Sequence, residues 1–188
     1  MIVAGNWKMN LNLNEAIRLS NELLKYDEMF LEQKVVIFPS FLFIPQIVKL
    51  FENSEISIGA QDCSKYDNGA LTGQVSAEMI NAAGCKYVIV GHSERRLLCH
   101  ETSSDILQKA RNAISVGLKV IICLGESLKD REDKVYLSVL EKQLKESLQT
   151  AMYHGKDTLI LWGQDSRENR FFSRKLMCPS TGIGFPSP

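Results

Sequence analysis

Six short apolar segments alternate with segments of helical periodicity over the first 162 residues. The apolar segments contain almost no polar alternation, as expected for strands that are covered on both faces of a parallel sheet. They occupy residues 2–5, 35–38, 56–60, 87–90, 120–123 and 158–162. A strand and a helix therefore repeat five times and a sixth strand follows, which predicts a parallel α/β architecture.

Three of the expected helices have a recognisable start or end. Asn12 or Asn14 is expected to cap the first helix, because asparagine side chains satisfy free N–H groups at helix starts. Gly117 is expected to end the helix whose apolar stripe runs from residue 106 to 114. The remaining stripes predict helices near residues 44–50, 76–83 and 140–152, the last ended by His154 and Gly155.

Charge and cysteine content exclude several classes of function. The 188 residues carry 22 basic and 22 acidic side chains, so no net field attracts nucleic acid or an anionic membrane. The chain contains no CxxC pair and has an odd number of cysteines: Cys63, Cys85, Cys99, Cys123 and Cys178. This usage favours a reducing compartment. There is no signal-like N-terminus and no run of 18 apolar residues, so we expect a cytoplasmic protein without a membrane partner.

Chemically active side chains follow two of the expected strands. Gly91 ends the strand at residues 87–90, and His92 comes directly after it. Asn6 and Lys8 follow the first strand in the same way. Because parallel strands bring their carboxyl ends to one edge, these residues are candidates for a common site. Taken singly, His92 could be a hydrogen-bonded turn residue, Lys8 a solvated loop lysine and Asn6 a turn former.

Five segments occur in the order and context of a known family. They lie at the carboxyl ends of strands or in the loops that follow, at residues 4–10 (AGNWKMN), 59–62 (GAQD), 69–73 (GALTG), 90–96 (VGHSERR) and 123–126 (CLGE). With them the chain resembles triosephosphate isomerase over residues 1 to about 162. The resemblance implies an incomplete (β/α)8 TIM barrel with about five βα units and a sixth strand.

The resemblance also implies an activity and roles for site residues. The family interconverts dihydroxyacetone phosphate and D-glyceraldehyde 3-phosphate through an enediolate, in glycolysis and gluconeogenesis, without cofactor or metal. His92 would be the electrophile, working as a neutral imidazole. Lys8 would supply positive charge beside the oxyanion and phosphate, and Asn6 would orient a substrate oxygen. Glu94 would support the lysine, although it could instead be a carboxylate favoured by a helix N-terminus.

The loop after the third strand resembles the arm through which this family dimerises. By the resemblance, Thr72 would lie near the site of the partner subunit. Two positions depart from the family pattern: Leu71 stands where an aromatic residue is usual, and Gln74 stands where a glutamate is usual. We expect a homodimer whose arm contact is weakened by these two changes.

The sequence departs from the family at the position of the catalytic base. The family has a glutamate after the sixth strand, and here Gln164 falls near that position. The family's lid and its seventh and eighth βα units are not recognisable. We therefore expect a partial barrel at residues 1–162, an irregular tail at 163–188, and an isomerase of poor activity or none. A substitute base at Asp165 or Glu168 remains open, as do a truncated non-catalytic remnant and a binding or assembly module that uses the open sheet edge.

Overall fold

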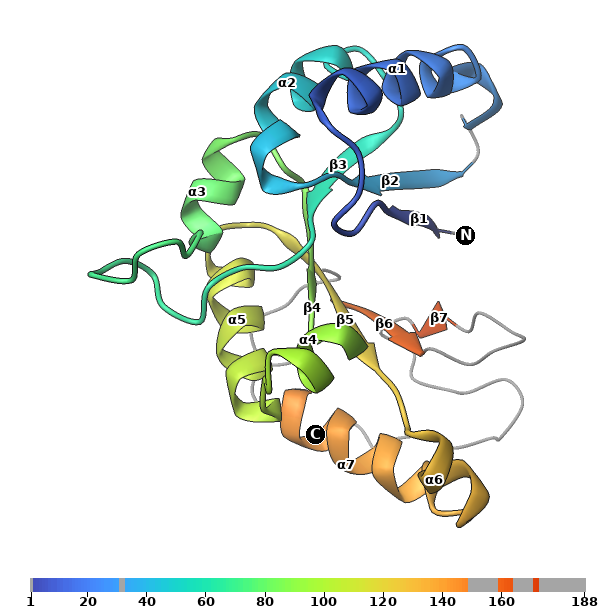
Figure 1. Cartoon of the computed structure of the whole chain (residues 1–188), viewed down its shortest axis with the longest axis vertical. Helices are drawn as coiled ribbons and strands as arrows, with labels where there is room; N and C mark the ends of the chain where they lie inside the picture. The colour runs from blue at the N-terminus through green and yellow to red at the C-terminus, as the bar shows by residue number, and fades with distance from the viewer. Residues whose placement is uncertain (1, 31–32, 149–158, 164–170, 173–188) are drawn as a thin grey trace.

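The computed structural model describes residues 2–30, 33–148, 159–163 and 171–172. Its strands form one curved sheet in the order β1-β2-β3-β4-β5-β6-β7, so each strand pairs with its neighbours in sequence (Figure 1). The pairs from β1 to β6 are parallel, and β7 is antiparallel to β6. The expected parallel α/β fold is confirmed, as an incomplete barrel.

The strands lie close to the expected apolar segments. Their bounds are Ile2–Asn6 (β1), Lys34–Phe38 (β2), Ser57–Ala60 (β3), Tyr87–Val90 (β4), Lys119–Leu124 (β5), Leu159–Gly163 (β6) and Phe171–Phe172 (β7). The sixth strand thus extends one residue beyond the expected end of the partial barrel. Phe171 and Phe172 pair with Trp162 and Leu161, in a part of the tail for which no strand was expected.

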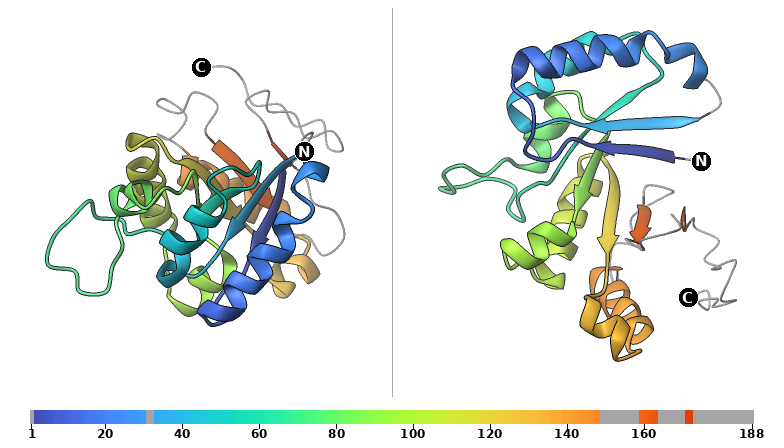
Figure 2. Two further views of the ribbon diagram at one scale, coloured as in Figure 1. Left: turned by 90° about the horizontal axis from the view of Figure 1, so that it is seen from above. Right: turned by 45° about the vertical axis from the view of Figure 1, so that its right-hand side comes forward.

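Helices lie on the outer face of the curved sheet (Figure 2). The α-helices are Leu13–Leu24 (α1), Ile44–Leu50 (α2), Ala77–Ala82 (α3), Ser93–Leu98 (α4), Ser103–Ser115 (α5), Leu128–Glu132 (α6) and Tyr136–Leu148 (α7). Short 3-10 helices lie at Asp27–Phe30 and Phe41–Phe43. No helix was predicted at α4 or α6, because their sequences, SERRLL and LKDRE, are mostly charged and show no apolar stripe. The expected end of the long helix, at His154 and Gly155, lies outside the described residues.

Side-chain caps fix where α1 and α5 begin. Asn12, and not Asn14, caps α1: its side chain accepts the Glu15 N–H, and the Glu15 carboxylate accepts the Asn12 N–H. Thr102 and Asp105 form the same reciprocal pair at the start of α5. Gly117 ends α5 with a positive φ of 85°, as its place in the sequence predicts.

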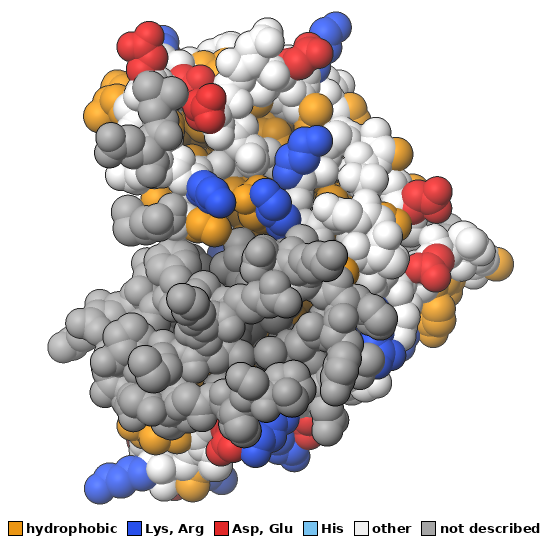
Figure 3. Space-filling model, turned by 180° about the vertical axis from the view of Figure 1, so that it is seen from behind, with side chains coloured by type: hydrophobic (Ala, Val, Ile, Leu, Met, Phe, Trp, Pro, Cys, Tyr) orange, Lys and Arg blue, Asp and Glu red, His pale blue; other side chains and the backbone are white. Residues whose placement is uncertain are grey.

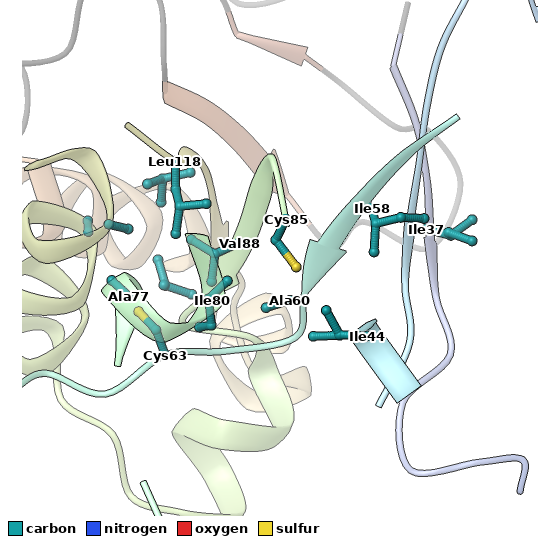
Figure 4. Packing of buried hydrophobic residues seen from close by; sticks show 14 of the residues in the cluster. Ile37, Ile44, Ile58, Ala60, Cys63, Ala77, Ile80, Cys85, Val88 and Leu118 are labelled. Carbon is teal, nitrogen blue, oxygen red and sulfur yellow. The ribbon is translucent and has the colours of Figure 1, made fainter. Parts of the chain in front are cut away.

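Apolar side chains form a cluster on each face of the sheet. The larger cluster lies between sheet and helices, where Ile58 and Val88 from the strands pack with Ile80 of α3 (Figure 4). The smaller cluster lies on the concave face and includes Phe38 and Tyr87. This double coverage explains why the strand sequences show no polar alternation.

The described surface carries mixed charge. Figure 3 shows Lys and Arg side chains interspersed with Asp and Glu on one face of the described residues, in keeping with the equal numbers in the sequence. Among the helices of the described part, none has the length and apolar character required to cross a bilayer.

Candidate active site

Side-chain hydrogen bonds from Asn6 and Gln61 hold the turn that follows β1. Asn6 Oδ1 accepts the Lys8 N–H at 2.9 Å. Lys8 itself has a φ of 54°, in the left-handed region that is uncommon for residues other than glycine. Gln61 Nε2 donates to the Lys8 and Phe38 carbonyl oxygens, each at 2.9 Å. The turn that carries Lys8 is thereby tied to the ends of β2 and β3.

His92 lies at the boundary between β4 and α4. It is the N-cap of α4, and its Nδ1 accepts the Glu94 N–H at 3.3 Å. A ring nitrogen that accepts a hydrogen bond carries no proton, so in the neutral imidazole the proton is on Nε2. His92 therefore presents an Nε2–H donor, which is the group that can hydrogen-bond a substrate carbonyl oxygen.

Burial keeps the His92 imidazole neutral. The side chain is 18% exposed. Burial lowers the pKa of His92 from its ordinary value of 6.5; the Glu94 carboxylate opposes this change and the Lys8 ammonium adds to it. The imidazole is consequently a neutral hydrogen-bond donor at pH 7.

Lys8 and Glu94 form an ion pair beside His92. Lys8 Nζ lies 2.7 Å from Glu94 Oε1, and Glu94 Oε2 lies 3.4 Å from His92 Nδ1. The hydrogen bond from Lys8 lowers the pKa of Glu94. A carboxylate with a lowered pKa and an ion-pair partner is a weak proton acceptor, so Glu94 is suited to hold Lys8 and unsuited to remove a proton from carbon.

A cluster of four charged side chains, three of them largely buried, lies behind α4. Arg95 Nε contacts Asp62 Oδ2 at 2.8 Å and Glu101 Oε1 at 2.6 Å. Lys109 of α5 also contacts both carboxylates, and its side chain is only 6% exposed. Burial raises the pKa of Asp62 despite these cations. The cluster joins the end of β3 to α4 and α5, and so supports the helix that begins at His92.

The structure brings together Asn6, Lys8 and His92, which the strand ends predicted, and Glu94, which the resemblance added. Asn6, Lys8, His92 and Glu94 are linked by the hydrogen bonds and ion pairs given above. Thr72 is exposed, in the loop that projects between β3 and α3 (Figure 1). Gln164, Asp165 and Glu168 lie outside the described residues.

Pattern reasoning missed the supporting residues Gln61, Asp62, Arg95 and Lys109. The first three lie inside the segments that carry the family resemblance, which was the available signal. Lys109 gave no signal, because a lysine on a helix is ordinarily exposed. In the described part of the chain, no group of three or more His, Cys, Asp or Glu side chains is arranged to hold a metal ion.

The fold and the polar side chains at its strand ends define an incomplete (β/α)8 barrel with a candidate active site at the carboxyl edge. The family model described as triosephosphate isomerase matches residues 1–161. The chain belongs to the triosephosphate isomerase family.

Individual relatives agree over the same part of the chain. The triosephosphate isomerase of Chloroherpeton thalassium is 45% identical over 148 residues, which are 78% of this chain and 58% of the relative. That of Flavobacterium psychrophilum is 42% identical over 147 residues, covering 78% and 59%. The chain thus spans about six-tenths of the length of these relatives. The crystal structure of the Bartonella henselae triosephosphate isomerase superposes with a TM-score of 0.77 at 31% identity, covering 86% of this chain and 66% of that one.

Proposed function

We propose that this chain carries the electrophilic half of a triosephosphate isomerase site, and that its own turnover is far below that of a full-length relative. The reaction is the interconversion of dihydroxyacetone phosphate and D-glyceraldehyde 3-phosphate through an enediolate. The observation that carries the proposal is the convergence of a neutral His92, Lys8 and Glu94 at one strand edge.

Each residue has a role that follows from its chemistry. The His92 Nε2–H donates to the substrate carbonyl oxygen and stabilises the negative charge that develops there. Lys8 places its ammonium beside that oxygen and the phosphate, and Glu94 holds the ammonium in place. The Asn6 amide orients a substrate oxygen.

Turnover is expected to be poor because no suitable general base is present among the proposed site residues. Moving a proton between adjacent carbons requires a carboxylate whose proton affinity suits the task, and Glu94 is already paired with Lys8. Gln164, near the family's glutamate position, is an amide and cannot accept the proton. Loss of a general base lowers the rate by a factor of about 10²–10⁴.

A coupled assay of glyceraldehyde 3-phosphate conversion by the 188-residue chain tests the proposal. We expect weak activity that His92→Ala abolishes and that Gln164→Glu raises at least about tenfold. Equal activity in the unaltered chain and in His92→Ala would overturn the proposal. The two alternatives, a non-catalytic remnant and a binding or assembly module, would then remain. If Gln164→Glu has no effect while His92→Ala does, Asp165→Asn and Glu168→Gln would identify a substitute base.

We also propose that the chain forms a homodimer through the loop at residues 61–76. The loop projects from the body (Figure 1). Its glycines Gly69 and Gly73 have positive φ angles, and a Cβ built on either would meet nothing within 4 Å beyond the neighbouring residues of the chain. Leu71 at the tip is exposed, as are Leu97 and Leu98 in α4. A second copy would bury these side chains and bring Thr72 toward its site. Sedimentation of the unaltered chain and of the Leu71→Asp variant tests this. If the unaltered chain is a monomer at all concentrations, the proposal is contradicted.

The cysteines support a proposed cytoplasmic location. Cys63, Cys85 and Cys123 are buried free thiols, and burial raises the pKa of each to about 12. Such thiols are compatible with a reducing compartment, which is where glycolysis and gluconeogenesis take place. Fractionation of cells that express the tagged chain tests this: recovery outside the soluble cytoplasmic fraction contradicts it.

A further inference from the structure

Arg96 makes contacts that no role assigned so far explains. It is a half-buried residue of α4, and none of the ion pairs given above includes it. Its Nε donates to the Gly91 carbonyl oxygen at 2.9 Å, and its Nη2 donates to the Cys123 carbonyl oxygen at 3.1 Å. The guanidinium therefore joins the ends of β4 and β5 through backbone groups.

The backbone of Arg96 contacts the other side of the same histidine. Its N–H donates to the His92 carbonyl oxygen at 3.1 Å. The Gly91 carbonyl belongs to the peptide unit before the His92 Cα, and the His92 carbonyl belongs to the unit after it. The Arg95 N–H also donates to the His92 carbonyl oxygen, at 2.9 Å, but only Arg96 contacts both peptide planes that flank His92. These planes set the backbone angles of His92, φ −52° and ψ 143°.

The close packing at Gly91 is part of the same arrangement. Gly91 has a φ of +70°, and a Cβ built on it would lie 3.1 Å from Arg96 Nη2 and 2.9 Å from Ile106 Cδ1. The absence of a side chain lets the guanidinium reach the carbonyl oxygens of both strands. A lysine could not replace it, because its single ammonium lacks the separated donors of the guanidinium fork.

We propose that Arg96 is a positioning residue for His92, fixing the direction of the imidazole through the two peptide units beside it. The inference rests on the proposed role of His92 as electrophile. Its test measures the imidazole itself, so it stands whether or not the chain turns over substrate. The titratable groups that face His92 are Glu94 in α4 and Lys8 after β1.

The matched variants are Arg96→Lys and Arg95→Lys in the 188-residue chain. Both keep the charge and both weaken the anchoring of α4, but only the first removes side-chain bonds to the Gly91 and Cys123 carbonyl oxygens. NMR of the labelled histidine rings follows the pKa of His92, assigned by the signal that His92→Gln removes. The other two histidines, His100 and His154, give internal references.

In Arg96→Lys we expect the pKa of His92 to rise toward its ordinary value of 6.5, because a displaced imidazole loses its burial. In Arg95→Lys it should change by no more than ~0.1 pH unit. A His92 titration that is unchanged in Arg96→Lys, or altered equally in both variants, overturns the proposal.

A second measurement needs no variant and covers the case in which Arg96→Lys does not fold. In the unaltered chain, the Arg96 Nε–H should exchange with solvent at least about tenfold more slowly than that of exposed Arg18, since it is hydrogen-bonded. Equal exchange at the two positions contradicts the proposal. Failure of the isomerase assay alone would remove the proposed function and leave this result unaffected.

Discussion

Lys8 and Glu94 are 86 positions apart in the sequence, and their side chains meet at 2.7 Å. Lys8 follows β1 and Glu94 follows β4, strands that are separated in the sheet by β2 and β3. The pair crosses the carboxyl edge of the curved sheet and places a cation and an anion beside His92. Both side chains are about half exposed, and exposed ion pairs add little to the free energy of unfolding. The pair therefore contributes mainly to the charge at the site.

The Glu94→Gln substitution should lower the pKa of His92 further. The Glu94 carboxylate favours the imidazolium and so raises that pKa, whereas Lys8 lowers it and would remain. The free energy of unfolding should change by less than ~1 kcal/mol. An NMR titration of His92 measures the first effect and urea unfolding the second. Glu52→Gln, an exposed change in the turn after α2, is the control, and a His92 pKa that rises in Glu94→Gln contradicts the assignment.

The Lys109→Met substitution should destabilise the fold by about 3–5 kcal/mol, because it leaves the Asp62 and Glu101 carboxylates buried with one cation fewer. Lys142→Met in α7 is the control: Lys142 is 76% exposed, and its change should stay within about 0.5 kcal/mol. Urea unfolding measures both. Equal unfolding midpoints would show that the buried cluster does not stabilise the fold.

The Gly59→Ala substitution should destabilise by about 1–3 kcal/mol through overpacking of the concave face. A Cβ at Gly59 would lie 2.3 Å from Phe38 Cε1 and 3.0 Å from Tyr87 Cβ, and Phe38 is fully buried. Gly5→Ala in β1 is the matched control, since its Cβ would meet Ile37 at an ordinary 3.5 Å. In thermal unfolding, the Tm of Gly59→Ala should lie well below that of Gly5→Ala. The reverse order would show that the Phe38 ring has room to move.

The Asp105→Asn substitution should make the free energy of unfolding depend less on pH between pH 5 and 2. Hydrogen bonds from Lys65 and Thr102 lower the pKa of Asp105 from 3.8 to about 2. The folded state therefore binds this proton less readily than the unfolded state. The resulting stability is present above pH 3.8 and is lost as the pH falls toward 2. Free energies of unfolding between pH 5 and 2 measure the slope, with Asp67→Asn in the exposed loop as control; an unchanged slope in Asp105→Asn contradicts the expectation.

The sequence predicted the strands and their common edge because local chemistry encodes both. An apolar segment without polar alternation has to be covered on two faces, and repetition with helices makes the strands parallel. The sequence alone therefore places Asn6, Lys8 and His92 at the same edge. It could not show α4, whose sequence SERRLL has no apolar stripe, nor the capping of α1 by Asn12 in preference to Asn14.

The sequence by itself determined the fold class, the edge that carries the site and the residue types available there. Only the tertiary structure decided which of those groups touch. The Nε2–H tautomer of His92, the engagement of Glu94 by Lys8 and the burial of Lys109 between two carboxylates all depend on contacts across many sequence positions. Hydrogen bonds and charge interactions act over a few ångströms, and a linear pattern does not specify distances between segments that only the folded sheet brings together.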